Sequence, residues 1–404
     1  MMTKSSIVKD VEWAIGSHRT LLQINGLWIY SEKHSWLEVV MNIQTLLLTL
    51  SIFGFVTLPQ TIALMKTWGN VTLIGDNIMS NLPVTMAGIK LIKMWTNKKI
   101  LVRMVKRIEN DWYQLSNNTE RDVMIKYAKI PKLMLLCGLI NITSSTLFYH
   151  ILSNFFGITL RATSNLTDIY GDKILPLQSV YFFDLSTTLS FYFISWSQLF
   201  GSLVASLVYT TFDITFGLFV LHTCALLENL SERIHNIPMG SEVKLQKILK
   251  SIVLQHCALI RFVGRIEEIF STVLLGLVIS FGVLFSVLGF QIVVSITDSE
   301  VQLPIFQATF YIVFMNYFLG LMFIYSWVGE NLIKRSDSLN DAIYNCDWTL
   351  LIAKDRRQMI LLLLNSQRKL CVTVGGVASV SLDTFAKLIK TSAGYISVLL
   401  AAKE

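Results

Sequence analysis

The sequence predicts an all-α membrane protein with seven transmembrane helices, and three observations support this. The 404 residues are 53% hydrophobic and only 15% charged, with a mean hydropathy of +0.56, which is far more apolar than a soluble globular chain. Several apolar runs are about twenty residues long, the length at which a helix crosses a bilayer. Lys and Arg gather in alternate connecting segments, as they do on the cytosolic side of membrane proteins.

The N-terminal tail, residues 1–36, mixes apolar residues with scattered charges. This pattern predicts a short interfacial helix followed by a turn at Asn25-Gly26, and a partly ordered tail fits the composition equally well. The uncharged run from Val39 to Leu58 is the first predicted span, which Pro59 is expected to end.

The next predicted spans are less uniform in composition. Val71 to Ile89 is the second span although it contains Asp76 and Pro83, because polar groups in a span can face other helices or a cavity. Residues 93–132 are basic and predict a cytosolic helical connection. Leu133 to Leu152 is the third span.

Leu185 to Phe212 is an uncharged fourth span, and Asp213 separates it from a second apolar run, Ile214 to Leu227. That run has 14 residues, too few for a span, so we expect it to continue the fourth helix into a cytosolic helical region. Ile269 to Ile296 and Leu303 to Val328 are the fifth and sixth spans, joined by a short loop that contains Asp298 and Glu300.

The C-terminal part divides into two. Residues 329–378 include an amphipathic stretch from Trp348 to Leu370, which is too charged to span and predicts a helix near the membrane or against a partner. Residues 379–404 are the seventh span. Asp383, Lys387 and Lys390 recur at helical spacing, and the same face continues through Gly394, Ser397 or Val398, and Ala401. The face is a candidate wall of an aqueous path, or its charges pair within a helix bundle.

Basic residues predict the orientation of the spans. The tail and the segments 93–132, 211–269 and 329–378 hold 27 Lys and Arg residues, and the three alternate loops hold three. The N-terminus is therefore expected in the cytosol and the C-terminus outside, which reverses a G-protein-coupled receptor. Sequons at Asn70 and Asn165 fall on the expected outer face. Because the net charge of +7 lies in these loops, we expect no nucleic-acid partner.

Enzyme and metal chemistry find no support in the sequence. The five cysteines form no C-x-x-C or Cys/His metal spacing, and the six histidines are scattered. No nucleophile, base and acid lie at catalytic spacing, and no internal repeat indicates a transporter. We therefore predict neither a cofactor, a metal site nor a catalytic residue.

Two groups of residues carry a resemblance to the insect odorant receptors. One is the series Trp348, Leu351, Arg357, Gln367, Phe385, Lys390, Tyr395 and Leu399. The other is Leu175-Pro176, Tyr181, Phe183, Asp184 and Gln198. Two positions depart from the family pattern: Leu189 stands where a proline is usual, and Gly394 where a serine precedes the tyrosine.

The resemblance implies an odorant-gated, non-selective cation channel in the plasma membrane of a sensory dendrite. It implies a heterotetramer with the odorant co-receptor subunit, in which cytosolic helical extensions, including residues 329–378, form an anchor region. It also implies that residues 379–404 line the pore, with a constriction at Val398 and an outer mouth at Ala401 and Ala402. The predicted pore residues are Asp383, Lys387, Lys390, Gly394, Val398, Ala401 and Ala402.

The resemblance further implies a pocket for a small volatile ligand in the outer half of helices one to six, within residues 37–328. An aromatic, Met-containing cavity suits an apolar ligand, although each aromatic taken alone could be ordinary packing. The predicted pocket residues are Met79, Leu82, Pro83, Thr146, Tyr149, His150, Phe191, Ile194, Ser195, Phe306, Thr309, Phe310 and Phe314.

Two alternatives stay open on the sequence. A gustatory receptor channel would be expected to end in T-Y-x-x-x-x-x-Q-F, whereas Tyr395 is followed by ISVLLAAKE. A G-protein-coupled chemoreceptor would be expected to carry D-R-Y after the third span and N-P-x-x-Y in the seventh, and neither is present.

Overall fold

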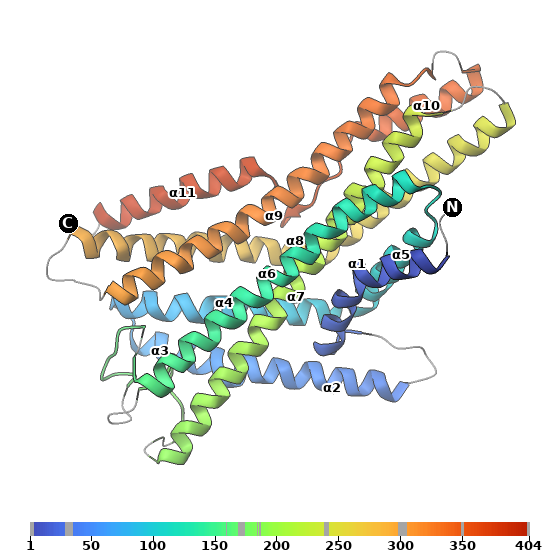
Figure 1. Ribbon diagram of the computed structural model, residues 1–404. Helices are drawn as coiled ribbons and strands as arrows, with labels where there is room; N and C mark the ends of the chain where they lie inside the picture. The colour runs from blue at the N-terminus through green and yellow to red at the C-terminus, as the bar shows by residue number, and fades with distance from the viewer. Residues whose placement is uncertain are drawn as a thin grey trace.

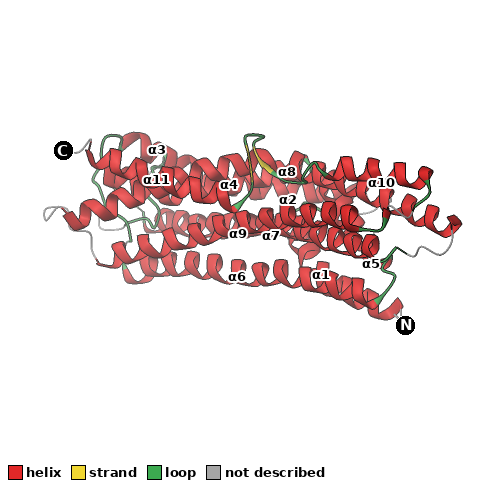
Figure 2. Cartoon of the chain, turned by 90° about the horizontal axis from the view of Figure 1, so that it is seen from above, coloured by secondary structure: helices red, strands yellow, loops and turns green. Residues whose placement is uncertain are grey.

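The computed structural model describes residues 4–28, 35–158, 160–168, 174–183, 185, 187–237, 242–297, 305–348 and 351–401. These residues form an elongated bundle of long helices that pack side by side (Figures 1 and 2). Helices α1 (Lys4–Ile24) and α10 (Ala353–Ser366) lie toward one end, and α3 (Leu58–Lys66) lies at the other (Figure 1). Among the described residues, five helices are long and apolar enough to cross a membrane.

The first predicted span differs from its expected length. Helix α2 (Ser35–Ile52) runs through a π-helical turn, Phe53–Thr57, directly into α3, so the prediction that Pro59 ends the helix is wrong. Pro59 lies in the first turn of α3, where a missing N–H is tolerated. An α-helix would pair the Phe55 carbonyl with the N–H at position 59. Here the Tyr181 hydroxyl donates to that carbonyl at 2.7 Å.

Among the next three helices, the first and the third begin at an asparagine whose side chain caps the helix. In α4 (Val71–Thr96), the Asn70 side chain accepts from the N–H of Leu73 at 3.2 Å. Helix α5 (Lys98–Tyr113) follows after one residue. At the start of α6 (Asn118–Phe156), Asn117 accepts from the N–H of Glu120 at 2.8 Å, and the Glu120 carboxylate accepts from the N–H of Ser116, one residue before the N-cap. Helix α6 joins part of the basic connection to the third predicted span, and α4 extends beyond Ile89.

Helix α7 (Thr188–His235) is the centre of the bundle. It is one continuous helix of 48 residues, which confirms that the run after Asp213 continues the fourth helix. Nearly every residue from Val208 to Ala225 is buried, because α7 packs against α2, α4, α6, α8 and α9. A helix that is apolar on all faces is expected at such a central position.

Two long helices and a short hairpin complete the described chain. Helices α8 (Glu242–Thr297) and α9 (Ile305–Asn345) contain the fifth and sixth predicted spans, and the predicted loop with Asp298 and Glu300 lies outside the described residues. Within the amphipathic stretch predicted from Trp348 to Leu370, α10 covers only Ala353–Ser366. Strands β1 (Thr373–Val374) and β2 (Ala378–Ser379) pair antiparallel, with Thr373 opposite Ser379.

The hairpin determines where the last helix starts. The N–H of Thr373 donates to the Glu267 carboxylate at 2.7 Å, and the N–H of Gly375 donates to the Ser271 carbonyl at 3.1 Å, so the hairpin is fixed to α8. Gly375 has φ of 61°, which favours glycine. Helix α11 (Leu382–Ala401) therefore begins three residues later than predicted and lies along α8 and α9 (Figure 1). The total of seven spans and their orientation stay predictions.

Candidate ligand-binding site

A cavity of about 260 Å³ lies between α4, α6, α7 and α9. Most of its wall is apolar, with a few hydroxyl and amide groups, as is typical of a site for a small apolar molecule. The lining residues are Met79, Ser80, Pro83, Val84, Asn141, Ile142, Ser145, Thr146, Tyr149, His150, Leu177, Ser202, Ala205, Ser206, Tyr209, Phe310, Val313, Phe314, Tyr317 and Phe318.

About half of the predicted pocket residues line this cavity. They are Met79, Pro83, Thr146, Tyr149, His150, Phe310 and Phe314. Five others lie elsewhere: Leu82 packs against the main core, Phe191 and Ile194 belong to a separate apolar cluster, Ser195 donates to the Asn154 side chain, and Thr309 is exposed. The Phe306 side chain lies outside the described residues.

Aromatic rings from α6 and α9 form one continuous wall of the cavity. The Phe310 ring centroid lies 5.8 Å from that of Tyr149 and 6.0 Å from that of Phe314, and Phe314 lies 4.8 Å from Phe318. Rings at these distances attract one another, so the wall is preorganised. The Nδ1 atom of His150 is buried and has no hydrogen-bond partner among the described residues, which leaves it available to a polar group of a ligand.

The residues predicted to line the cavity from α7 lie too close to the start of that helix. Ser202, Ala205, Ser206 and Tyr209 face the cavity, about two to four turns further along than the predicted Ser195. Their spacing of three and four residues places them on one face of α7, but because the helix is apolar on nearly all faces, the sequence carries no signal that singles out this one. The hydroxyls of Ser206 and Thr146 lie 3.0 Å apart, which joins α7 to α6 at the cavity wall.

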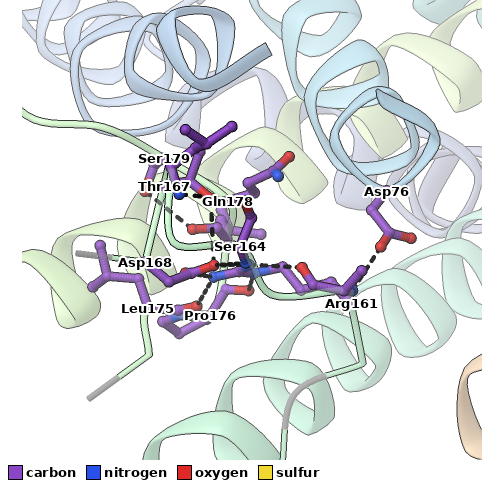
Figure 3. A network of polar contacts seen from close by, with 12 residues as sticks. Asp76, Arg161, Ser164, Thr167, Asp168, Leu175, Pro176, Gln178 and Ser179 are labelled. Carbon is purple, nitrogen blue, oxygen red and sulfur yellow. Dashed lines mark hydrogen bonds and ion pairs between the residues drawn. The ribbon is translucent and has the colours of Figure 1, made fainter. Parts of the chain in front are cut away.

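One end of the cavity is covered by residues 160–168 and 174–183, which we call the cover segment. Its Leu177 side chain lines the cavity, and the Tyr149 hydroxyl donates to the Pro176 carbonyl at 3.0 Å. Figure 3 shows the polar network that shapes this segment. Buried Arg161 binds Asp168 through two N–H groups, at 2.6 and 3.1 Å, and also donates to the carbonyls of Ala162, Leu175 and Pro176.

Side chains of α4 and α7 also attach the cover segment to the helices. Asp76 of α4 accepts from the N–H of Ala162 at 2.6 Å (Figure 3). It also accepts from the hydroxyl of Tyr311 in α9. Gln198 of α7 donates to the Ser179 and Tyr181 hydroxyls at 2.7 and 3.0 Å. Asp76 therefore faces another helix and the cover segment, as expected of a polar group inside a predicted span.

The other end of the cavity is closed by a buried ion-pair cluster, which consists of Lys90, Asp213, Tyr325 and Tyr209. Lys90 Nζ lies 2.5 Å from the Asp213 carboxylate and 3.1 Å from the ring centroid of Tyr209, whose side chain lines the cavity. The Tyr325 hydroxyl donates to the same carboxylate. Helices α4, α7 and α9 each contribute one hydrogen-bonding group, so the cluster joins the three helices directly below the cavity.

The predicted pore residues lie on an exposed face of α11. Lys387 Nζ lies 2.6 Å from the Asp383 carboxylate, and both side chains are more than 70% exposed, so they pair along the helix and not inside the bundle. Lys390, Gly394, Val398 and Ala401 are exposed as well, and Ala402 lies outside the described residues. Among the described residues, no group of three His, Cys, Asp or Glu side chains could hold a metal ion.

An apolar cavity with a few polar groups, set between long membrane-type helices, is the architecture of a membrane protein that binds a small molecule. The family profile described as 7tm odorant receptor matches residues 70–393 of this chain. The chain therefore belongs to the insect odorant receptor family, whose members are receptors and not enzymes.

Individual relatives agree with the profile. Odorant receptor 13a of Drosophila melanogaster is 24% identical, over 94% of this chain and 93% of its own length. Odorant receptor Or2 of Anopheles gambiae is 27% identical over 47% of this chain and 50% of its own length.

Solved structures share the fold. The insect olfactory receptor OR5 from Machilis hrabei in complex with eugenol superposes with a TM-score of 0.80, covering 98% of this chain and 99% of that chain. A second solved structure of the same receptor superposes with a TM-score of 0.77. Both are 14% identical to this chain, so the likeness concerns the fold.

Proposed function

We propose that this chain is the odorant-binding subunit of a ligand-gated, non-selective cation channel, assembled as a heterotetramer with the odorant co-receptor. The observation that carries the proposal is the apolar cavity between α4, α6, α7 and α9, whose wall contains seven of the predicted pocket residues. A volatile molecule is small and mostly apolar, and burial at roughly 25 cal/mol per Å² of apolar area is its main source of affinity. The eugenol complex of a structural relative fits this ligand class.

The proposed orientation places the N-terminus in the cytosol of a sensory neuron and the C-terminus outside. In this arrangement the tail (1–36), α5, the first part of α8 and the anchor region (329–378) are cytosolic, and the cover segment faces outward. The excess of 27 Lys and Arg residues over three supports it. An epitope tag at the C-terminus should be stained on intact cells, and staining only after permeabilisation would contradict the orientation.

We further propose that the exposed face of α11 lines the pore. A charged stripe on the outside of a single chain needs water or another subunit, and both are present at the axis of an oligomeric channel. Val398→Glu should alter conductance and ion selectivity, because it adds a charge at the proposed constriction. Val377→Glu is the matched control, since Val377 is 82% exposed in the hairpin turn. Equal behaviour of the two variants would reject the pore assignment.

The experiment that tests the channel proposal is whole-cell recording from cells that express this chain with and without the co-receptor. An odorant panel is applied while the pipette contains no nucleotides. A rapid cation current that requires both chains is expected. A current that appears only with pipette nucleotide, or no current with both chains at the surface, would count against a channel opened directly by ligand.

The cavity is tested by a matched pair of phenylalanines on the responding receptor. Phe310→Ala removes a ring from the cavity wall and is expected to weaken odorant sensitivity by about tenfold, which corresponds to ~1.4 kcal/mol of lost contact. Phe193→Ala removes the same ring from an exposed position on α7 and should leave the dose-response curve unchanged. Equal curves for both variants, with normal surface expression, would place the ligand elsewhere.

A further inference from the structure

A second cavity, of about 330 Å³, lies between α5 and the first part of α8 and is surrounded by arginines. Arg103 and Arg107 come from α5, and Arg261 and Arg265 come from α8. Its lining includes no residue of the proposed odorant cavity. Neither the predicted pocket nor the predicted pore involves these four side chains, so their convergence has no explanation in the proposed channel function.

The spacing of the arginines makes the site a two-sided cleft. Each helix contributes a pair four residues apart, which places both guanidinium groups of a pair on one helix face. The two faces meet at Phe262, because the Arg107 guanidinium lies 5.6 Å from its ring centroid. Ile100, Met104 and Phe262 form an apolar floor beneath the four cations, and the last two are buried.

Carboxylates compensate little of this positive charge. Arg107 lies 3.9 Å from Asp111, and that same carboxylate is 3.0 Å from His222. Among the residues that the structure describes, Arg103, Arg261 and Arg265 form no ion pair with an acidic side chain. The Nε atoms of Arg103 and Arg261 donate to carbonyls of their own helices, at 3.0 and 3.3 Å. Four like charges held around one cleft repel one another unless an anion lies between them.

We propose that this cleft binds an anion that carries two or more phosphate groups. Planar guanidinium groups bind phosphate oxygens through paired hydrogen bonds, and arginine is preferred where such recognition is needed. Two facing arginine pairs match two phosphates on one small ring or chain. The apolar floor suits a ligand with an apolar portion beside its phosphates, which favours a lipid head group over a free polyphosphate.

The position of the cleft relative to the membrane supports a lipid head group as the ligand. Ile269 begins the uncharged fifth span, and Arg265 and Arg261 precede it by four and eight residues. At ~1.5 Å per residue, the two guanidinium groups are attached roughly 6 and 12 Å from the apolar boundary, which is the layer of the head groups. That this is the inner leaflet rests on the proposed orientation, and basic pockets on that side are typical phosphoinositide sites.

The test uses the purified full-length chain and two soluble probes that share the phosphates. Dioctanoyl phosphatidylinositol bisphosphate carries the head group with short acyl chains, and inositol trisphosphate carries phosphates alone. The Arg103→Gln/Arg261→Gln variant should weaken binding of the lipid probe by about tenfold or more. The matched control is Lys99→Gln/Lys106→Gln, which removes two exposed charges from α5 outside the cleft and should change binding less than about twofold.

A second measurement uses the unmodified chain and does not depend on the folding of a variant. Phenylglyoxal labels accessible arginines, and peptide mass spectrometry reports each site. The lipid probe should slow labelling of Arg103 and Arg261 by about threefold or more, while Arg368, which is exposed and does not line the cleft, is labelled at the same rate.

The outcomes separate the ligand source from the site itself. Protection and tight binding by the lipid probe alone support a membrane head group, and equal effects of both probes support the phosphate site with a free ligand. Absence of binding by both probes, an equal loss in the control variant, or equal labelling of all three arginines would overturn the proposal. None of these results depends on whether the chain conducts ions.

Discussion

The two ends of the proposed odorant cavity are closed by polar networks that differ in the source of their partners. At the cover segment, Arg161 is satisfied by one neighbouring carboxylate and three backbone carbonyls, all from the same connecting segment. At the ion-pair cluster, Lys90 and Asp213 come from separate long helices and are held by side chains: each contacts the other, Tyr325 donates to Asp213, and the Tyr209 ring lies against Lys90. The first network shapes a loop, and the second joins helices.

This difference determines what each network loses when the receptor moves. A shift of the cover segment keeps the Arg161 network, because Arg161, Asp168 and the three carbonyls move together, and breaks the hydrogen bonds of the segment to the helices. The cluster cannot separate without leaving a charge buried between α4, α7 and α9, which costs several kcal/mol. We expect odorant entry to involve the cover segment, and the cluster to hold the three helices in register.

The largest effect is expected from breaking the cluster. Asp213→Ala leaves the Lys90 ammonium, whose side chain is 0% exposed, without its carboxylate, and should destabilise the chain by about 3–5 kcal/mol. Surface expression and the melting temperature of the detergent-solubilised chain measure this. The double variant Lys90→Met/Asp213→Leu should recover most of the loss, since an apolar pair leaves no charge unpaired. A single variant with a normal melting temperature would show that the pair is not needed.

Breaking the cover network should have a smaller effect on stability and a visible effect on ligand response. Arg161→Met removes the Asp168 pairing and three carbonyl contacts, for an expected loss of about 2–3 kcal/mol, limited because water can reach a loosened loop. Odorant dose-response curves and melting temperatures of the same variant measure both. Lys66→Met, an exposed cation at the same end of the bundle, serves as control. A larger loss of stability here than for Asp213→Ala would reverse the comparison.

A buried histidine in α1, His18, differs from both networks because it is uncharged at neutral pH. Burial, and secondarily the charge of Lys132, lowers the pKa of His18 in α1 to about 4. Below pH 6.5 the unfolded chain takes up a proton at this histidine and the folded chain does not, so stability falls as pH falls from 6.5 toward 4.

At pH 5 this loss should reach about 2 kcal/mol relative to pH 7.5. Thermal unfolding of the solubilised chain at both pH values measures it, with His18→Leu as the comparison because leucine does not titrate. An equal fall of melting temperature in both proteins would assign the pH dependence to other groups.

The smallest effect separates two cavity tyrosines, one at each end. The Tyr149 hydroxyl donates to the Pro176 carbonyl, so Tyr149→Phe should shift odorant sensitivity by about fivefold, or ~1 kcal/mol. Tyr209 contacts Lys90 through its ring, which phenylalanine retains, and Tyr209→Phe should change sensitivity less than about twofold. Dose-response curves at matched surface expression decide, and the opposite order would mean that the ligand binds the Tyr209 hydroxyl.

The order of most long helices could be predicted from the apolar runs of the sequence, but local departures from regular helix could not. The 14-residue run after Asp213 was too short to span, and α7 is continuous there. The prediction that the helix ends at Pro59 was wrong because a π-helical turn precedes the proline. The length and apolarity of the segment do not reveal such a turn.

The cavity wall was predicted only in part, even among its aromatic residues. Tyr149 and Phe310 were predicted and line the cavity, whereas Tyr209 lines it and was not predicted. Ser202 and Ser206 were missed because α7 is apolar on nearly all faces, so periodicity does not indicate which turn faces the cavity. Lys90 and Asp213 are 123 positions apart, and a single sequence carries no information about such a pair.

The carbonyl of Phe55, opposite the proline at position 59, bears on how receptors of this kind can be recombined. Tyr181 of the cover segment donates to it, and the N–H of Val180 donates to the Pro59 carbonyl at 3.1 Å, so one loop and the first long helix share a joint. A chimaera that transplants the cover segment without its matching helix would lose both bonds. Chimaeras made to transfer odorant specificity between receptors should therefore exchange the α2–α3 region and the cover segment together.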